Sequence, residues 1–378
     1  MEKFDTVIIG AGAAGVGLGT TFRHFGIQNF LIVEKDEVAS SFLQWPDEMH
    51  LISPSFQGNQ FGLRDLNAVT LDTSPGYTLQ REHPTGKEYA KYLRQVAAHY
   101  ELPIKEQTEV QNIQKNQEND KFKIETSEGP IQAKFVIWAG GEYQNSNEDI
   151  FQGSKHCKHN SKISSWKKFS KEHNKGDFVI VGGYESGIDA AVQLSKLERE
   201  STVLDSNEPW KSDDPDPSVS LSSFTAERLA REQKEKPEKI NLVSNTKIEK
   251  VEKTENDTYK VYADNKGIWE TKNPPILATG FQGSLDQVED FFEFEEHVQL
   301  TEYDESTTTD NFFLAGPSVQ HGEAIFCFIY KYRQRFAIIA EEVGKRLGID
   351  VEPAVEKYRE ENMYLDGPEE CCEDICRC

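Results

Sequence analysis

The sequence of 378 residues predicts an α/β fold made of two related units, and two observations lead to this prediction. The first is a pair of glycine-rich turns, at 10–15 and 182–187, each placed between a short apolar strand and a helical pattern. The second is a matching segment after each turn, at 108–140 and 246–280, in which polar and apolar residues alternate on both sides of a polar turn. Such alternation is typical of a hairpin with one solvated face. The chain therefore repeats a strand–turn–helix unit that is followed by a small antiparallel β-meander.

The first turn has the three glycines of a Rossmann-like dinucleotide-binding unit. Gly10 permits the tight turn, Gly12 lets the backbone approach a pyrophosphate, and Gly15 lets helix and strand pack closely. Glu34 ends the next strand, where an acid that binds a ribose is expected. The helix N-terminus would face the phosphates with its free N–H groups. These features predict a site for an adenine dinucleotide.

The second turn departs from this pattern. Gly182 and Gly187 are in place, but Tyr184 takes the position of the middle glycine, and Glu185 adds a negative charge near the expected phosphates. Asp205 ends the following strand, and no arginine comes directly after it, which favours NADH over NADPH. The turn predicts a nicotinamide dinucleotide site, and the alternative interpretation is a vestigial, empty unit.

A turn at the N-terminus combined with a second, inserted nucleotide unit is the arrangement of two-dinucleotide flavoproteins, and this analogy assigns FAD to the first turn. We therefore expect two Rossmann-like domains, each with its β-meander, with the NAD(P) domain inserted in the FAD domain. The expected parts are a discontinuous FAD-binding domain at 1–145 and 281–378, a linker at 146–176, an NAD(P)-binding domain at 177–280 and a cysteine-rich tail at 366–378.

The net charge of −23 argues against nucleic acid or an anionic membrane as a partner, because binding phosphates requires basic patches. The longest apolar runs are far below the roughly 18 residues that a membrane span requires. Because the start of the chain leads directly into a strand, we expect no signal peptide. We expect a cytoplasmic protein that acts on a small-molecule substrate and that could form a homodimer.

The chain resembles the superfamily of flavin-containing monooxygenases and thioredoxin-reductase-like proteins over nearly its whole length. The resemblance rests on the first turn, the aromatic-rich stretch 40–59, the segment 83–86, the strands that end at 139–140 and 278–281, and the final strand into Gly316.

Three features depart from that superfamily. Its monooxygenases carry the linker motif Phe-x-Gly-x-x-x-His, in which Cys157 takes the place of the histidine here and His159 follows two residues later. Gly316 is followed by proline, where the reductases have aspartate. No Cys-x-x-Cys lies beside either turn, so the dithiol of a conventional thioredoxin reductase has no candidate residues.

The resemblance implies an FAD-dependent oxidoreductase that takes hydride from NAD(P)H. It implies a monooxygenase-like reaction, in which a C4a-hydroperoxyflavin oxygenates a small soft nucleophile or a carbonyl. It also implies roles for Asn59, as a hydrogen-bonding group near the flavin adduct, and for His321, beside a final helix expected from about Gly322 to Leu347. A turn-capping Asn59 and a solvent-facing His321 are the alternatives.

The turns and the resemblance together assign the cofactor-binding residues. For FAD they are Gly10, Gly12, Ala14, Gly15, Glu34, Lys35, Trp45, Val110, Ala139, Gly140 and Gly316. For the nicotinamide dinucleotide they are Gly182, Gly183, Glu185, Ser186, Gly187, Asp205, Thr279 and Gly280.

Four of the six cysteines lie in the last eight residues, namely Cys371, Cys372, Cys376 and Cys378. In a cytoplasmic chain such a cluster favours soft-metal binding or thiol redox chemistry over a structural disulfide. The tail could accept electrons from the flavin, bind a soft metal or have no catalytic role. An alternative function is therefore a flavin-dependent thiol, disulfide or soft-metal reductase, and another is a non-enzymatic flavin- or metal-binding regulator.

Overall fold

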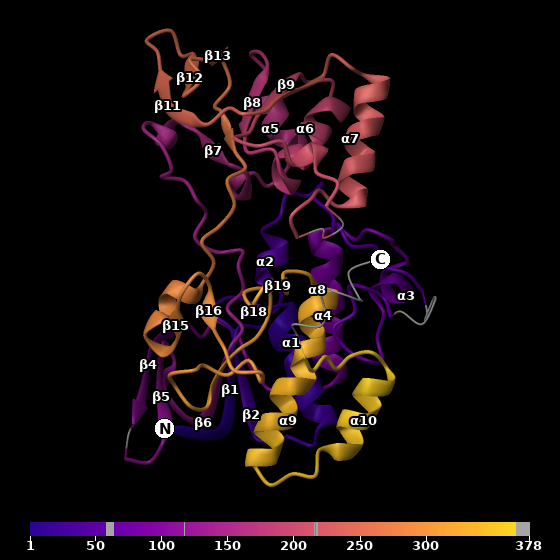
Figure 1. The fold of residues 1–378 in the computed structure, drawn as a ribbon, viewed down its shortest axis with the longest axis vertical. Coiled ribbons are helices and arrows are strands. Elements are labelled where there is room, and N and C mark those ends of the chain that lie inside the picture. Colours follow the sequence, from indigo (N-terminus) through magenta and orange to yellow (C-terminus); the bar gives the residue numbers. More distant parts are fainter. Residues whose placement is uncertain (58–63, 117, 215, 217, 368–378) are drawn as a thin grey trace. The chain divides into compact units, whose positions relative to one another are not determined.

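The structure is a computed structural model that describes residues 1–57, 64–116, 118–214, 216 and 218–367. The chain divides into two compact units (Figure 1). The first unit comprises Met1–Leu43, Pro54–Glu142 and Gly283–Cys378, and the second comprises Gln44–Ser53 and Tyr143–Gln282. The predicted α/β class is confirmed, because each unit contains helices and a sheet that includes parallel strands.

The first unit is built on a seven-stranded sheet of order β3-β2-β1-β6-β5-β4, in which β17 pairs with β6. Its strands are β1 (Glu2–Ile9), β2 (Phe30–Val33), β3 (Ile104–Lys105), β4 (Val110–Asn116), β5 (Lys121–Thr126), β6 (Gly129–Trp138) and β17 (Phe312–Leu314). β1 is parallel to β2 and β6, and β17 is parallel to β6. The strands β4, β5 and β6 form the expected antiparallel meander.

The main helices of the first unit are α1 (Ala13–His24), α4 (Gly86–His99), α9 (Phe336–Arg346) and α10 (Glu352–Glu360). Shorter ones are α2 (Ser40–Leu43), α3 (Pro75–Leu79) and α8 (Ile329–Tyr332). α1 packs closely against α9. At Gly17 an added Cβ would lie 2.3 Å from the ring of Phe336. α4 begins with a capping box in which Thr85 and Glu88 exchange hydrogen bonds.

The predicted start of the final helix near Gly322 is wrong. Gly322 has a φ of +55° and turns the chain between β18 (Gln320–His321) and β19 (Ala324–Ile325). The first helical residue after this hairpin is Ile329. Glycine with positive φ favours a tight turn over a helix start, so His321 lies in a hairpin.

The second unit contains a five-stranded parallel sheet of order β10-β9-β8-β14-β7 and a three-stranded meander, β11-β12-β13. The parallel strands are β7 (Lys158–His159), β8 (Phe178–Val181), β9 (Ser201–Leu204), β10 (Ile240–Val243) and β14 (Ile276–Leu277). The meander is β11 (Ile248–Lys253), β12 (Tyr259–Ala263) and β13 (Ile268–Thr271), and the helices are α5 (Trp166–Glu172), α6 (Glu185–Lys196) and α7 (Ser223–Glu235).

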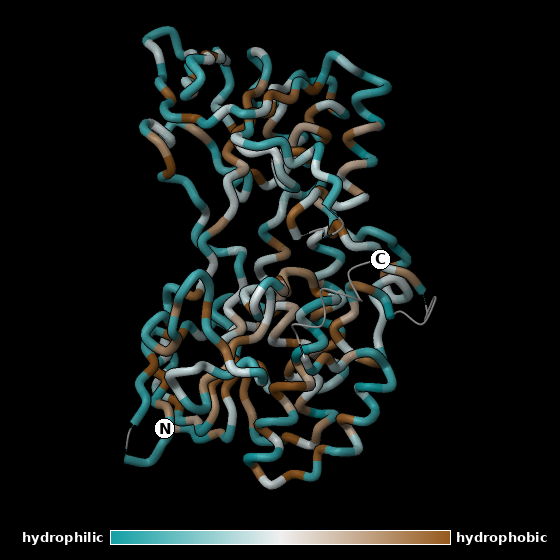
Figure 2. The backbone as a smooth tube through the Cα atoms, in the orientation of Figure 1, coloured by the Kyte–Doolittle hydropathy of each residue, from teal (hydrophilic) through white to brown (hydrophobic). Residues whose placement is uncertain are grey.

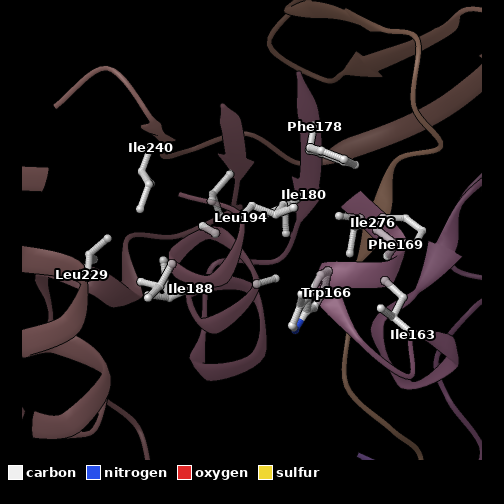
Figure 3. Close-up of a cluster of buried hydrophobic side chains, with 14 residues drawn as sticks. Ile163, Trp166, Phe169, Phe178, Ile180, Ile188, Leu194, Leu229, Ile240 and Ile276 are labelled. Atoms are coloured by element: carbon white, nitrogen blue, oxygen red, sulfur yellow. The ribbon is translucent and has the colours of Figure 1, made fainter. Parts of the chain in front are cut away.

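The segment 146–176, expected to be a linker, contributes a strand and a helix to the second unit. β7 pairs with β14 at the edge of the sheet. Ile163, Trp166 and Phe169 are buried in the core cluster of this unit (Figure 3). The sequence pattern is weak because these three apolar residues, spaced by three, stand among many lysines and serines.

Residues 44–53 also belong to the second unit, although they lie within the sequence range expected for the FAD domain. The Glu48 carboxylate accepts hydrogen bonds from the Trp166 N–H at 2.9 Å and the Ser165 hydroxyl at 2.7 Å. A carboxylate at this place accepts hydrogen bonds from the free N–H groups at the start of α5. Its negative charge also interacts favourably with the positive end of the helix dipole. A side chain far away in sequence therefore caps this helix.

Apolar segments run through the strands and the inner helices of each unit (Figure 2). In the part of the chain that the structure describes, no helix has the length and apolar character needed to cross a membrane.

Replacement of Trp166 tests whether α5 is part of the core of the second unit. The side chain is fully buried, so Trp166→Ala should lower the free energy of unfolding by about 3–5 kcal/mol. Lys168→Ala, at an exposed position of the same helix, should change it by less than about 0.5 kcal/mol. Urea unfolding of both variants measures the difference, and equal stabilities would show that α5 is peripheral.

Candidate dinucleotide-binding sites

Two glycines of the first turn are required by close contacts within the protein. Gly10 has a φ of +108°, and a Cβ there would lie 2.4 Å from the carbonyl oxygen of Ala139. A Cβ on Gly15 would lie 1.8 Å from the carbonyl oxygen of Gly10. Such contacts are far inside van der Waals distance, so the close packing of α1 on the end of β1 depends on both glycines.

Gly12 differs, because nothing in the described protein requires a glycine there. Its φ is −77°, which any residue adopts, and an added Cβ would meet no atom within 4 Å. α1 begins at the next residue without a side-chain cap and without an acidic residue in its first turn. Open space in front of an uncapped helix N-terminus is what a bound pyrophosphate requires. The first turn therefore has the shape and polarity to hold a dinucleotide.

Glu34 connects the second strand to this turn. Its side chain is 7% exposed, and its Oε2 accepts a hydrogen bond from the Ala11 N–H at 2.8 Å. Its Oε1 accepts one from the Asp36 N–H at 3.0 Å. The carboxylate thus fixes the turn relative to the end of β2, where the ribose-binding acid of such a unit is expected.

Parallel pairing brings further predicted residues to the same edge of the sheet. β6 ends at Trp138, next to the ends of β1 and β17, so Ala139, Gly140 and Gly316 lie beside the turn. A Cβ on Gly140 would lie 2.5 Å from the Ser284 hydroxyl oxygen. Gly316 has a φ of +109°, and a Cβ there would lie 3.1 Å from the Cβ of Ala14. The carboxyl edge of a parallel sheet is where ligands bind in such folds.

Three other residues assigned to FAD lie apart from this group of glycines. Lys35 is exposed directly after Glu34. Val110 begins β4, two residues after Thr108, whose N–H donates to the Glu34 carbonyl oxygen at 2.8 Å. Trp45 belongs to the second unit, where its ring centroid lies 6.3 Å from that of Tyr143.

The remaining predicted residues divide into two groups. Asn59 and the tail cysteines Cys371, Cys372, Cys376 and Cys378 lie outside the described residues. His321 is described, and its Nε2 lies 2.6 Å from Oδ1 of Asp304.

Asp304 is fully buried and also accepts hydrogen bonds from Nε and Nη2 of Arg335, at 3.0 and 2.8 Å. Burial alone would raise the pKa of Asp304, but Arg335 and His321 outweigh it and lower that pKa. His321 therefore contacts a buried ion pair formed by Asp304 and Arg335. The sequence does not reveal this contact, because Asp304, His321 and Arg335 are separated by 17 and 14 residues and match no motif.

The second turn has the same backbone as the first, despite its different sequence. Gly182 has a φ of +101°, and a Cβ on Gly187 would lie 1.8 Å from the Gly182 carbonyl oxygen. Tyr184 has φ and ψ of −89° and −164°, compared with −77° and −164° for Gly12. Tyrosine therefore causes no backbone strain at the middle position, and its effect comes from its side chain alone.

Tyr184 and Glu185 both contact the segment that leads into α7. The Tyr184 hydroxyl donates a hydrogen bond to the carbonyl oxygen of Ser220 at 2.8 Å. The Glu185 carboxylate accepts one from the Thr225 hydroxyl at 2.6 Å and one from the Ser222 N–H. The Glu185 carboxylate, which was expected near the phosphates, is therefore hydrogen-bonded to the start of α7.

Asp205 has the same role in the second unit as Glu34 in the first. Its Oδ2 accepts a hydrogen bond from the Gly183 N–H at 2.6 Å. Trp210 covers this turn, since a Cβ on Gly183 would lie 2.3 Å from its ring. The sequence did not single out Trp210, whose position depends on the loop after β9.

The other residues assigned to the second site lie close to the same turn. β14 ends beside β8, and the Ala278 carbonyl oxygen would lie 2.3 Å from a Cβ on Gly182. Thr279 follows, and its hydroxyl donates to the carbonyl oxygen of Asn147 at 2.6 Å. Gly280 has a φ of +72°. Ser186 is partly buried in the first turn of α6.

A model of one protein family matches residues 7–316, which include both turns and most of the main sheet of each unit. The chain belongs to the pyridine nucleotide-disulphide oxidoreductase family. This membership confirms the prediction of an oxidoreductase.

Curated relatives match part of the chain. The oxidoreductase CzcO of Bacillus velezensis is 29% identical over 209 residues, which are 54% of this chain and 56% of the relative. The bacilliredoxin reductase Bdr of Bacillus subtilis is 25% identical over 210 residues, 54% of this chain and 57% of the relative. The chain thus matches little more than half the length of these relatives.

Solved structures share the fold over nearly the whole chain. The bacillithiol disulfide reductase Bdr of Staphylococcus aureus has a TM-score of 0.72 and 22% identity, and covers 92% of this chain and 99% of its own. A flavin-containing monooxygenase of Stenotrophomonas maltophilia has a TM-score of 0.68 and 17% identity, with 92% and 100% covered. At this identity the similarity establishes the fold alone.

The different surroundings of the three glycines provide a test of the first site. Gly12→Ala should leave the thermal stability nearly unchanged, because the added methyl group meets open space in the protein. It should weaken FAD binding by about tenfold or more, or about 1.4 kcal/mol, because the methyl group enters the pyrophosphate space. Fluorescence titration of the apoprotein with FAD measures the affinity.

Gly15→Ala serves as the contrasting variant. Its Cβ meets the Gly10 carbonyl, so this variant should lose thermal stability as well as FAD affinity. If Gly12→Ala bound FAD as tightly as the wild type, the diphosphate would not pass over this turn.

Proposed function

We propose that the chain binds FAD at the first turn and NAD(P)H at the second, and that it transfers a hydride from the nicotinamide to the flavin. The observation that supports this best is the closely similar backbone of the two turns, each bonded to an acid that follows the next strand. Bound FAD would supply the redox chemistry, accepting two electrons from the nicotinamide and passing them to a second substrate.

The residues of the chain would bind and orient the two cofactors. The N–H groups at the start of α1 would hold the FAD diphosphate, and Glu34 would accept a hydrogen bond from a ribose hydroxyl. In the second unit Asp205 would do the same for the nicotinamide dinucleotide. Asn59 and His321 stay candidates for contact with the flavin ring. The carboxylate of Asp304 would keep His321 in place beside such a ring.

For the oxidising substrate we propose dioxygen, with oxygen transfer to a small soft nucleophile or a carbonyl. The cysteines among the described residues are Cys157 in the second unit and Cys327 in the first, so the described part contains no vicinal dithiol that could receive electrons. Burial raises the pKa of the Cys157 thiol to about 12, which makes it a poor nucleophile.

A second candidate is a thiol or disulfide reductase that uses the tail cysteines. It is favoured by the similarity to the bacilliredoxin reductase of Bacillus subtilis and by the four cysteines at 371–378. Such a reaction would move two electrons from reduced flavin to a tail disulfide and then to a substrate disulfide.

Anaerobic mixing of the FAD-loaded protein with NADH or NADPH tests the hydride transfer. Because Asp205 would repel a 2′-phosphate, NADH should bleach the flavin at least about tenfold more efficiently, measured as the second-order rate constant in a stopped-flow instrument. Failure of both coenzymes to bleach the flavin would refute the proposed function. Faster reduction by NADPH would refute only the coenzyme preference.

Removal of the tail separates the two candidate acceptors. A chain that ends at Gly367 should keep its rate of NADH oxidation with dioxygen, because the proposed oxygenation uses no tail residue. Turnover with a disulfide substrate should be lost only if the tail carries electrons. Full-length protein with serine at 371, 372, 376 and 378 is the control for the loss of chain length, and a parallel loss of oxygen consumption in both would contradict the oxygenase proposal.

A further inference from the structure

The second turn differs from the first in being joined to a neighbouring helix. Glu185 is the first residue of α6, whereas the first turn has Ala13 at the corresponding position of α1. The carboxylate of Glu185 accepts hydrogen bonds from Ser222 and Thr225, at the N-terminus of α7. The helix start that would attract a diphosphate is therefore beside a carboxylate that belongs to the protein.

Other charged side chains lie on the elements around Glu185. On α6, Asp189 adds a second negative charge, and Arg228 on α7 is paired with Asp189, their atoms 2.6 Å apart. At the end of β9, the carboxylate of Asp205 is bonded to the turn itself. Neutral donors on Ser222 and Thr225 thus contact Glu185, while Arg228 is paired with Asp189.

Burial favours the neutral form of this side chain. It raises the pKa of Glu185 above the ordinary value, while the hydrogen bonds from Thr225 and Ser222 act in the opposite direction and Asp189 adds to the rise. A second anion near α6 would disfavour the charged form further, because like charges in a partly desolvated site repel.

We infer that Glu185 takes up a proton when the diphosphate of the nicotinamide dinucleotide binds at the second turn, so that this side chain makes coenzyme affinity depend on pH. The inference rests on the proposed function. One proton passes from solvent to the carboxylate, and no other bond forms or breaks. The protonated side chain keeps its contact with α7, since its carbonyl oxygen still accepts and its hydroxyl can donate.

The sign of the effect follows from linkage. The bound state has the higher pKa for Glu185, so binding is strongest below the pKa of the free protein and weakens as the pH rises through it. Above that value the dissociation constant should rise by up to about tenfold per pH unit until the pKa of the complex is reached. Glu185→Gln mimics the protonated form, so its affinity should be independent of pH over the same range.

Calorimetric titration of the full-length, FAD-loaded protein with ADP-ribose tests the inference. This probe contains the diphosphate but cannot reduce the flavin. We expect proton uptake by the wild type, detected as a heat that depends on the ionisation enthalpy of the buffer, and none by Glu185→Gln. The variant should bind more tightly than the wild type at alkaline pH and about equally at acid pH.

Glu227→Gln is the matched control, because it makes the same change of charge at an exposed position of α7 and should retain the pH dependence of the wild type. Equal pH profiles and no proton uptake in wild type and Glu185→Gln would overturn the inference and leave the proposed function intact. Absence of binding in all three proteins at every pH would overturn the proposed function, and the inference with it.

Discussion

The contact on which both sites depend is the approach of a helix start to the end of the preceding strand. In each unit the last glycine of the turn lies so close to the first that a Cβ would be 1.8 Å from its carbonyl oxygen. This contact directs the free N–H groups of the helix over the carboxyl edge of the sheet, which is where parallel pairing brings the ends of the neighbouring strands. An acid from the next strand then fixes the turn through a single N–H group in each unit.

The two turns have similar backbone conformations but different charges at the start of the following helix. At the first, Gly12 leaves open space and α1 has no acidic residue in its first turn. At the second, Tyr184 extends to Ser220 and Glu185 binds the start of α7. The tyrosine in place of the middle glycine is thus not a defect of the backbone, because the conformation is one that any residue adopts. What differs is the charge at the start of the helix and the hydrogen bonds that join the second turn to α7.

Some parts of the fold depend on residues that are far apart in sequence. Glu48 caps α5 from a segment more than a hundred residues earlier, and Trp166 fills the core from a stretch that is mainly polar. Asp304, which is buried with Arg335, likewise contacts His321 from 17 residues earlier in the chain. Each of these contacts stabilises the position of an element whose local sequence is weakly patterned.

The sequence by itself determined the α/β class, the two turns, the acids Glu34 and Asp205 and the two meanders, because each depends on residues close together in the chain or on a simple periodicity. It could not predict the start of α8 at Ile329, the inclusion of 146–176 in the second unit or the bonding of Glu185 to α7. These depend on which side chains meet after the sheets have formed, and burial and hydrogen bonding across long separations leave no periodic signal. The tertiary structure alone therefore decided how the charge at the second turn is held.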